Sequence, residues 1–186
     1  MTDFEVRPAT SHTRMRWANG GGWTTEIIAE PSGAEWTWRL SAAEVEVDGP
    51  FSSFPGVDRS IALLRGAGFV LTVGGRDEQV IDTRFEPFEF AGDEATTCRL
   101  IDGPVHDINL MVTRNSVPRH LDFTRIAADS VSELVDIDVV VVVAGQVRIG
   151  DHLLGYLDAI RCVTPPRSVT LTAVGDDAVV ATTASR

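Results

Sequence analysis

The sequence predicts an all-β fold with very little helix. Many short segments are rich in β-branched and aromatic residues, and turn signals built on glycine, proline or aspartate separate most of them. Amphipathic stretches of about 10–15 residues, which a βαβ fold needs between its strands, are missing. Short strands with turns at intervals of about 8–12 residues are typical of a sandwich or barrel.

The expected strands follow one another along the chain, at residues 25–29, 36–45, 60–64, 69–73, 79–82, 96–100, 107–113, 120–126, 135–144, 147–149, 169–173 and 178–183. Only residues 129–135 look helical, over a turn or two. The stretch "DVVVVVAGQVRIG" indicates a buried strand, a turn around Gly145 and a return strand, as in a hairpin. A junction is expected at residues 114–120, around Pro118, which predicts domains at 1–116 and 117–186 with strand exchange allowed between them.

Composition and charge exclude several classes of function. The formal net charge of −11 disfavours nucleic acids and anionic membranes as partners. All 16 basic residues are arginine, so neither a Schiff-base lysine nor a P-loop lysine is available. The longest apolar run, Val139–Ala144, is far shorter than the roughly 20 residues of a membrane span, and "MTDFEVRPAT" lacks the pattern of a secretory signal. We therefore expect a cytoplasmic protein.

Cysteine and histidine usage argues against a disulfide framework and against a metal centre. Cys98 and Cys162 form no CxxC pair and are expected to be buried free thiols. The histidines form no HxH pair and are widely separated in the sequence, at His12, His106, His120 and His152. No metal and no cofactor are expected, although a site built from scattered ligands, as in a metal-dependent oxygenase, stays open.

A run of three glycines, Gly20 to Gly22, lies between Trp17 and Trp23 in "RWANGGGWTTEI". Glycine runs that hold phosphate groups lead into a helix, whose N-terminus supplies amides and a favourable dipole. Here the run leads into an expected strand. The alternative, a tight passage of the backbone around a small pocket, is therefore preferred.

Polar side chains follow one face of three expected strands. Because successive residues of a strand point to opposite faces, the sets that share a face are Asp107, Asn109 and Met111, then Arg39 and Ser41, then Thr24 and Glu26. One interpretation is the solvated side of an antiparallel sheet. The other is that these faces converge in the mouth of a barrel, where small barrels hold ligands. The mixed polar types and the neighbouring glycine-rich turns favour the second.

Four segments in order resemble the HutD/Ves family over roughly residues 14–114: "RWANGGGWTTEI", "WRLSAAEVEVDGPFSSFPGVDRSIALLRGAG", "FAGD" and "GPVHDINLMVTR". The resemblance implies a cupin-type fold in which two small β-barrel units are fused, a bicupin, with the pocket in the first unit. It also implies a bacterial protein associated with histidine utilisation, where the family is thought to modulate the pathway. This chain departs from the family pattern at Ala18, where a basic residue is frequent, and at Ile108, where phenylalanine is frequent.

The ligand-binding residues implied by these motifs are Trp17, Asn19, Gly21, Thr24, Glu26, Arg39, Ser41, Arg59, Asp107, Asn109 and Met111. The pocket that the shared motifs imply also includes Gly20, Gly22, Phe51, Pro55, Gly56, Asp58 and Arg114. Arg39 and Arg59 are the best candidates to bind a carboxylate through a bidentate guanidinium, although Arg59 equally suits a structural ion pair with Asp58. Asn19 suits either a ligand contact or the turn beside the glycines.

Aromatic residues leave two interpretations open. Trp17 and Trp23 suit stacking on a planar ligand, but tryptophan more often packs in a core. The loop "DGPFSSFPG", residues 48–56, either clasps the barrel mouth or packs on its own aromatic side chains.

These observations favour a binding protein over an enzyme. The expected ligand is a small anionic metabolite of histidine breakdown, such as urocanate or a formyl- or formimino-glutamate compound, and the sequence allows a homodimer. The alternative is a metal-independent cupin enzyme with Glu26, Asp107 or His106 as its acid and base. A purely structural or protein-interaction role would instead place the polar strand faces on the outside.

Overall fold

The computed structural model describes residues 4–75, 78–165 and 167–185 and is all-β, as predicted. It divides into two compact units. The central unit runs from Thr13 to Val117, and the terminal unit combines the described residues before Thr13 with those from Pro118 onward. The domains expected from the sequence, 1–116 and 117–186, differ from this division in the residues up to His12 and at Val117.

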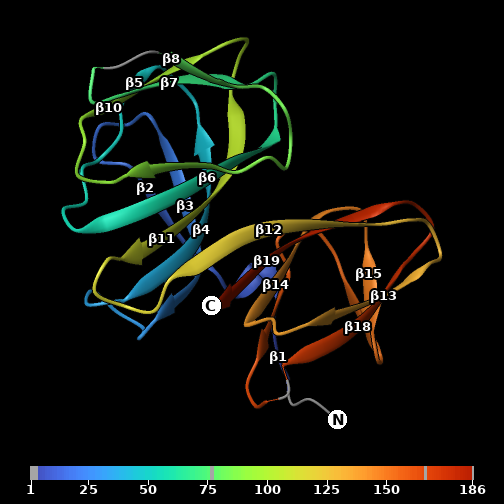
Figure 1. Cartoon of the computed structure of the whole chain (residues 1–186). Coiled ribbons are helices and arrows are strands. Elements are labelled where there is room, and N and C mark those ends of the chain that lie inside the picture. Colours follow the sequence, from blue (N-terminus) through green and yellow to red (C-terminus); the bar gives the residue numbers. More distant parts are fainter. Residues whose placement is uncertain (1–3, 76–77, 166, 186) are drawn as a thin grey trace. The chain divides into compact units, whose positions relative to one another are not determined.

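Two antiparallel sheets build the central unit (Figure 1). The first has six strands in the order β2-β3-β4-β11-β6-β9 and the second has four in the order β5-β10-β7-β8. Their bounds are β2 Thr13–Arg16, β3 Gly22–Glu30, β4 Trp38–Val45, β5 Gly49–Pro50, β6 Val57–Arg65, β7 Phe69–Val73, β8 Glu78–Ile81, β9 Phe88–Ala91, β10 Thr96–Leu100 and β11 Val105–Thr113. One core cluster includes Ile61 and Leu63 from the first sheet and Phe69, Leu71 and Cys98 from the second, so the sheets face each other.

Two β-bulges change the direction of side chains in the six-stranded sheet. The register of β3 on β4 shifts between Glu26 and Ile28, and the register of β11 on β6 shifts between His106 and Asp107. A bulge inserts one residue and re-aims those beyond it. Ile27 and Ile28 are consecutive and both buried, which a regular half-solvated strand does not allow.

The terminal unit also consists of two antiparallel sheets, in the orders β1-β17-β14-β19-β12 and β13-β18-β15-β16 (Figure 1). The bounds are β1 Phe4–Arg7, η1 Ala9–Ser11 (a 3₁₀ turn), β12 Arg119–Ile126, β13 Val131–Val135, β14 Val139–Ala144, β15 Val147–Ile149, β16 His152–Leu154, β17 Ala159–Cys162, β18 Ser168–Ala173 and β19 Ala178–Ser185. Its core is mostly aliphatic and draws on both sheets, for example on Val140, Val142, Leu171 and Val180.

Two expectations for the terminal unit were wrong. The segment 129–135 is not helical, because β13 pairs with β18 over five positions and buries Leu134. The Val-rich stretch is not a hairpin: β14 pairs with β17 and β19, whereas β15 pairs with β16 and β18. Gly145, at a φ of 68°, lies so close to the Asp177 carbonyl that a Cβ would be 2.5 Å from its oxygen, and the chain passes there from one sheet into the other.

Both cysteines are buried free thiols, as predicted. Burial raises the pKa of the Cys98 thiol to about 12, with a smaller contribution from Asp107. Within the described part of the chain, no helix combines the length and the apolar character that crossing a membrane requires.

Candidate functional site

A cavity of about 280 Å³ lies in the central unit against the inner face of the six-stranded sheet. Four strands supply its floor and two segments, 17–19 and 50–54, complete its wall. The lining residues are Trp17, Ala18, Asn19, Thr24, Arg39, Ser41, Ala43, Pro50, Phe51, Ser52, Phe54, Arg59, Ile61, Asp107, Asn109 and Met111. The volume lies near the lower end of the range of about 300–1,000 Å³ for ligand pockets, so it suits a small metabolite.

Strand register explains why the polar residues meet on this floor. β11 lies between β4 and β6, and Met111 is opposite both Arg39 and Arg59. Two residues along, Asn109 is opposite Ser41 and Ile61. Side chains at directly opposite positions share a face and lie within reach of one another.

The polar floor is buried and is not the solvated side of the sheet. Asp107 and Ser41 are each 2% exposed, Arg59 is 6% exposed and Asn109 is 7% exposed. Buried polar groups normally form hydrogen bonds, and groups that lack them call for an explanation. Here the unpartnered buried atoms include Nε of Arg39 and of Arg59 and Oδ1 of Asp107 and of Asn109.

Aromatic rings surround both guanidinium groups. That of Arg59 lies 4.8 Å from the centre of the Phe90 ring, 5.3 Å from Phe51 and 5.7 Å from Phe54. Burial lowers the pKa of Arg59 to about 10, which Asp107 partly opposes. Arg59 therefore stays cationic at neutral pH in an environment that hydrates it poorly, which favours an incoming anion.

Arg39 is less buried and has more partners. Its Nη1 lies 3.9 Å from Glu26 Oε2, its Nη2 lies 3.6 Å from Met111 Sδ, and its guanidinium lies 5.4 Å from the Trp36 ring. Burial lowers its pKa as well, and the Glu26 carboxylate raises it in part. With Arg59, it places two positive charges on one cavity wall.

Asp107 is the only carboxylate in the lining of the cavity that the described residues form. Burial raises its pKa to about 7, and the charge of Arg59 opposes that increase. Asp107 and Arg59 are thus each driven toward the neutral form by desolvation and each held charged by the other.

The glycine run shapes the cavity edge. Gly20 has a φ of 75°, which favours glycine, and a Cβ on Gly22 would be 2.3 Å from the Glu44 carbonyl oxygen, which excludes any other residue there. Asn19 Oδ1 accepts a hydrogen bond of 2.9 Å from the Gly21 N–H, while Asn19 also lines the cavity. Asn19 therefore forms the turn and contributes to the wall.

Trp17 is held in place at this edge. Its Nε1 donates a hydrogen bond of 2.8 Å to Thr24 Oγ1, and its ring meets Phe51 edge-on with centroids 5.9 Å apart. Trp23 does not line the cavity; Arg14 and Arg16 lie over its ring at 4.4 and 4.9 Å. Of the two tryptophans, only Trp17 is placed to touch a ligand.

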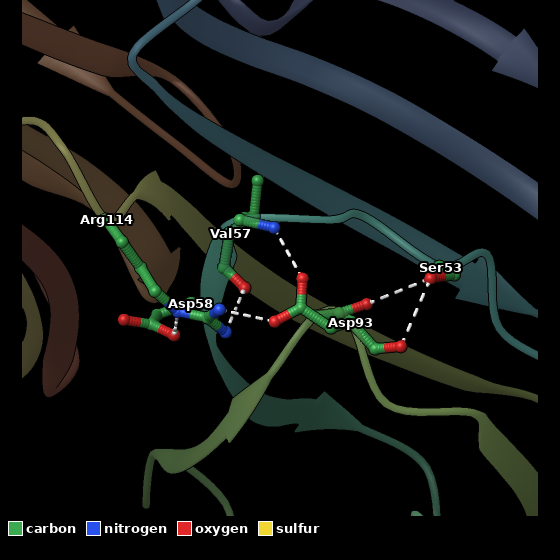
Figure 2. Close-up of polar contacts among 7 residues, drawn as sticks. Ser53, Val57, Asp58, Asp93 and Arg114 are labelled. Atoms are coloured by element: carbon green, nitrogen blue, oxygen red, sulfur yellow. Dashed lines mark hydrogen bonds and ion pairs between the residues drawn. The ribbon is translucent and has the colours of Figure 1, made fainter.

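A polar clasp holds the end of the 48–56 loop (Figure 2). Asp93 accepts hydrogen bonds from the Gly56 N–H and from the Arg114 guanidinium, and Arg114 Nε also donates to Asp58 Oδ1 at 2.7 Å. These bonds lower the pKa of Asp93, the Gly56 contact contributing most, and raise the pKa of Arg114. Asp58 therefore pairs with Arg114 in the clasp, and its neighbour Arg59 points into the cavity.

Most of the predicted ligand-binding residues lie together. Nine line the cavity, whereas Gly21 lines a smaller adjoining hollow of about 160 Å³ and Glu26 lies behind Arg39. Phe51 is one of the motif residues expected at the pocket, and the 48–56 loop, for which a clasp of the barrel mouth was one of two interpretations, also supplies Pro50, Ser52 and Phe54. Ala43 and Ile61 were not expected in the lining, and Ala18 was noted only as a departure from the family pattern. His106 is not in the lining; it lies opposite Glu44, on the other face of β11 from Asp107.

The donor set does not suit a transition metal. Within the described residues, the cavity lining has one carboxylate and neither histidine nor cysteine. Metal sites in proteins typically need at least three such ligands. No cluster of three or more histidine, cysteine, aspartate or glutamate residues that could hold a metal occurs in the described ranges 4–75, 78–165 and 167–185.

Sequence comparison identifies relatives of this chain. The HutD family model matches residues 9–181. An uncharacterised 21.2 kDa protein in the hutC 3′ region of Pseudomonas putida is 37% identical over 113 residues, which is 60% of this chain and 59% of that protein. Protein Ves of Citrobacter koseri is 36% identical over 145 residues, 74% of this chain and 72% of the relative. Protein Ves of Cronobacter sakazakii is 38% identical over 100 residues, 53% of this chain and 55% of the relative, so the chain spans little more than half the length of two of these proteins.

Solved structures with the same fold cover nearly the whole chain. A conserved protein of unknown function from Pseudomonas aeruginosa PAO1 has a TM-score of 0.85 at 26% identity, with 99% of this chain and 100% of that chain covered. HutD from Pseudomonas fluorescens SBW25 has a TM-score of 0.77 at 32% identity, with the same coverage. The nickel(II) complex of the pirin YhhW from Escherichia coli, at 13% identity, has a TM-score of 0.69 over 98% of this chain and 99% of that one, which shows a shared cupin-like fold alone.

Proposed function

The chain belongs to the HutD family, and from that premise we propose that it is a metal-free protein that binds a small anionic metabolite in the cavity of the central unit. The observation that carries the proposal is the pair Arg39 and Arg59 on one wall, each with a buried Nε that lacks a hydrogen-bond partner. A carboxylate is the group that a guanidinium binds best, through two parallel hydrogen bonds.

The rest of the cavity supports a small, partly planar ligand. Ser41 and Asn109 offer hydrogen bonds beside the arginines, and Trp17 and Phe51 offer aromatic surface. Intermediates of histidine breakdown such as urocanate, N-formyl-L-glutamate and N-formimino-L-glutamate combine a carboxylate with such groups. The gene context named for the Pseudomonas putida relative, the hutC 3′ region, supports a modulator of histidine utilisation. Each unit has two facing sheets, which supports the view that the chain is a bicupin.

Calorimetric titration with these three compounds tests the proposal. We expect at least one to bind, and Arg59→Gln to weaken that binding by roughly 30-fold or more. The matched control is Arg99→Gln, because Arg99 is an exposed arginine that pairs with Glu78 at 3.2 Å. Failure of all three compounds to bind at millimolar concentration would contradict the proposed ligand class.

One observation favours a second candidate, a metal-independent enzyme. Burial raises the pKa of Asp107 to about 7, the range in which a general acid or base works best. His106, the third acid–base candidate, lies on the opposite face of the strand and is therefore excluded as an acid or base for a ligand in the cavity. Turnover of a bound metabolite that Asp107→Asn stops while binding persists would establish this candidate, whereas unchanged ligand recovered after prolonged incubation would reject it.

A further inference from the structure

Asp107 presents a problem for an anion-binding cavity, because a carboxylate on its floor should repel the ligand. Arg59, Arg39 and Asp107 are the charged groups in the described lining of the cavity; Glu26 pairs with Arg39 behind it, and Asp48 lines the adjoining hollow. Together these groups leave no excess of positive charge when all are ionised. An anion that enters alone leaves a net negative charge in a poorly solvated space, which is costly.

The elements packed around Asp107 present few charges to it. Arg59 of β6 is close enough for its charge to act on Asp107, and Arg39 of β4 is close enough to affect Arg59. From the facing sheet, Cys98 of β10 is near and stays neutral, because burial raises its thiol pKa to about 12. On β11 itself Asn109 is neutral and His106 points to the opposite face, and from β3 Glu26 pairs with Arg39.

We infer that Asp107 takes up a proton when the anion binds, so that the cavity accepts an anion and a proton together and the neutral Asp107 carboxyl serves as a hydrogen-bond donor. The inference rests on the proposed function. Solvent supplies the proton, which forms an O–H bond on the carboxylate, and no other bond changes. The anion neutralises Arg59, the group that kept Asp107 ionised, and adds a negative charge nearby; both effects favour protonation.

Geometry selects Asp107 over Glu26 for this role. Asp107 is 2% exposed and its Oδ1 is buried without a hydrogen-bond partner in the protein, so the charge of Arg59 is what opposes its neutralisation. The Glu26 side chain is 29% exposed and pairs with Arg39. The remaining unsatisfied atom on the floor, Asn109 Oδ1, does not titrate.

The experiment measures binding of N-formyl-L-glutamate and of formate, as the minimal carboxylate, at pH values from about 6 to 9. Because the pKa of Asp107 in the free protein is about 7, the dissociation constant should be nearly constant below pH 7 and rise toward about tenfold per pH unit above it. Calorimetry at pH 8 in Tris and in HEPES, which differ in ionisation enthalpy, should show uptake of about one proton per anion bound.

Asp107→Asn, which fixes a neutral donor at the position, should bind with a dissociation constant that does not change with pH, and without proton uptake. His106→Asn is the matched control, since it removes a titrating neighbour on the other face and should keep the wild-type pH profile.

Wild-type binding that is independent of pH with no proton uptake overturns the inference and leaves the proposed function intact. Asp107→Asn binding that is weaker than wild type at every pH also overturns it, because Asp107 would then act as an ionised acceptor. If neither anion binds at any pH, the titration is repeated with urocanate and N-formimino-L-glutamate, and failure of these as well defeats the proposed function itself. If Asp107→Asn does not fold, the number of protons that the wild-type protein takes up on binding decides whether the inference stands.

Discussion

Each unit buries an aspartate, and the two aspartates differ in how completely the protein hydrogen-bonds them. In the terminal unit, both oxygens of Asp138 accept hydrogen bonds: one from Arg167, the other from Arg119 and from the Ser185 N–H. In the central unit, Asp107 lies against a cavity and its Oδ1 has no partner.

A buried acid whose two oxygens both accept hydrogen bonds from the protein stabilises the fold, whereas a buried acid with an unpartnered oxygen can still bind a ligand. The same contrast extends to the cores. The terminal unit packs an aliphatic cluster, while the central unit interrupts its core with a polar floor of Ser41, Arg59 and Asn109. The central unit thus gives up some apolar packing at the place where binding is expected.

The largest expected effect is the loss of stability on substitution of Asp138, whose two oxygens are both hydrogen-bonded. Asp138→Ala removes the partner of two arginines and should lower the free energy of unfolding by roughly 3 kcal/mol, near the lower end for a buried ion pair because Arg167 is partly exposed. Urea denaturation followed by circular dichroism measures it. A change below about 1 kcal/mol would show that the Asp138 cluster is not a stabilising element.

Arg59→Gln tests the binding role proposed for the central unit. Loss of a buried guanidinium that faces the ligand should weaken anion binding by about 2 kcal/mol or more, roughly 30-fold, with the fold retained. Calorimetry with N-formyl-L-glutamate gives the affinity. Equal loss of affinity in Asp138→Ala would remove the distinction between a structural and a binding unit.

The pH dependence of stability separates the two aspartates further. The pKa of Asp107 in the folded protein is about 7, against an ordinary value of 3.8, so between these values the folded protein retains a proton that the unfolded chain has lost. Wild-type stability should therefore fall relative to Asp107→Asn as pH rises from about 4 to 7, by at most about 1.4 kcal/mol per pH unit. Parallel stability curves for the two proteins would contradict the raised pKa.

The smallest expected effect is at the clasp in Figure 2. Asp93→Asn should loosen the loop that carries Phe51 and Phe54 and weaken binding by about threefold, chiefly through faster dissociation. Hydrogen exchange of residues 51–56 should increase. Glu78→Gln, which breaks another exposed ion pair of the central unit, is the control and should change neither quantity. An unaltered dissociation rate in Asp93→Asn would show that the clasp does not position the loop.

The sequence by itself determined the all-β class and the grouping of side chains within each strand. Period-two alternation is a local property of an extended backbone, so Arg39 falls on the same face as Ser41, and Asp107 on the same face as Asn109, whatever the strands pair with. The sequence also predicted a tight passage of the backbone at the glycine run. The structure explains why glycine suits these positions, because a Cβ would be strained at Gly20 and is excluded at Gly22.

Tertiary structure alone decided which strands pair, and so which faces meet. The strands on either side of Gly145 are joined by two residues yet lie in different sheets, and the residues expected to be helical, 129–135, form a strand because β18 is available to pair with them. Partner choice depends on contacts between segments far apart in sequence, which no local pattern encodes. For the same reason only the fold showed that Arg59 lies close enough to Asp107 for their charges to interact and that Asp58 belongs to the clasp. Only the fold showed, too, that both oxygens of Asp138 are hydrogen-bonded while Oδ1 of Asp107 has no partner.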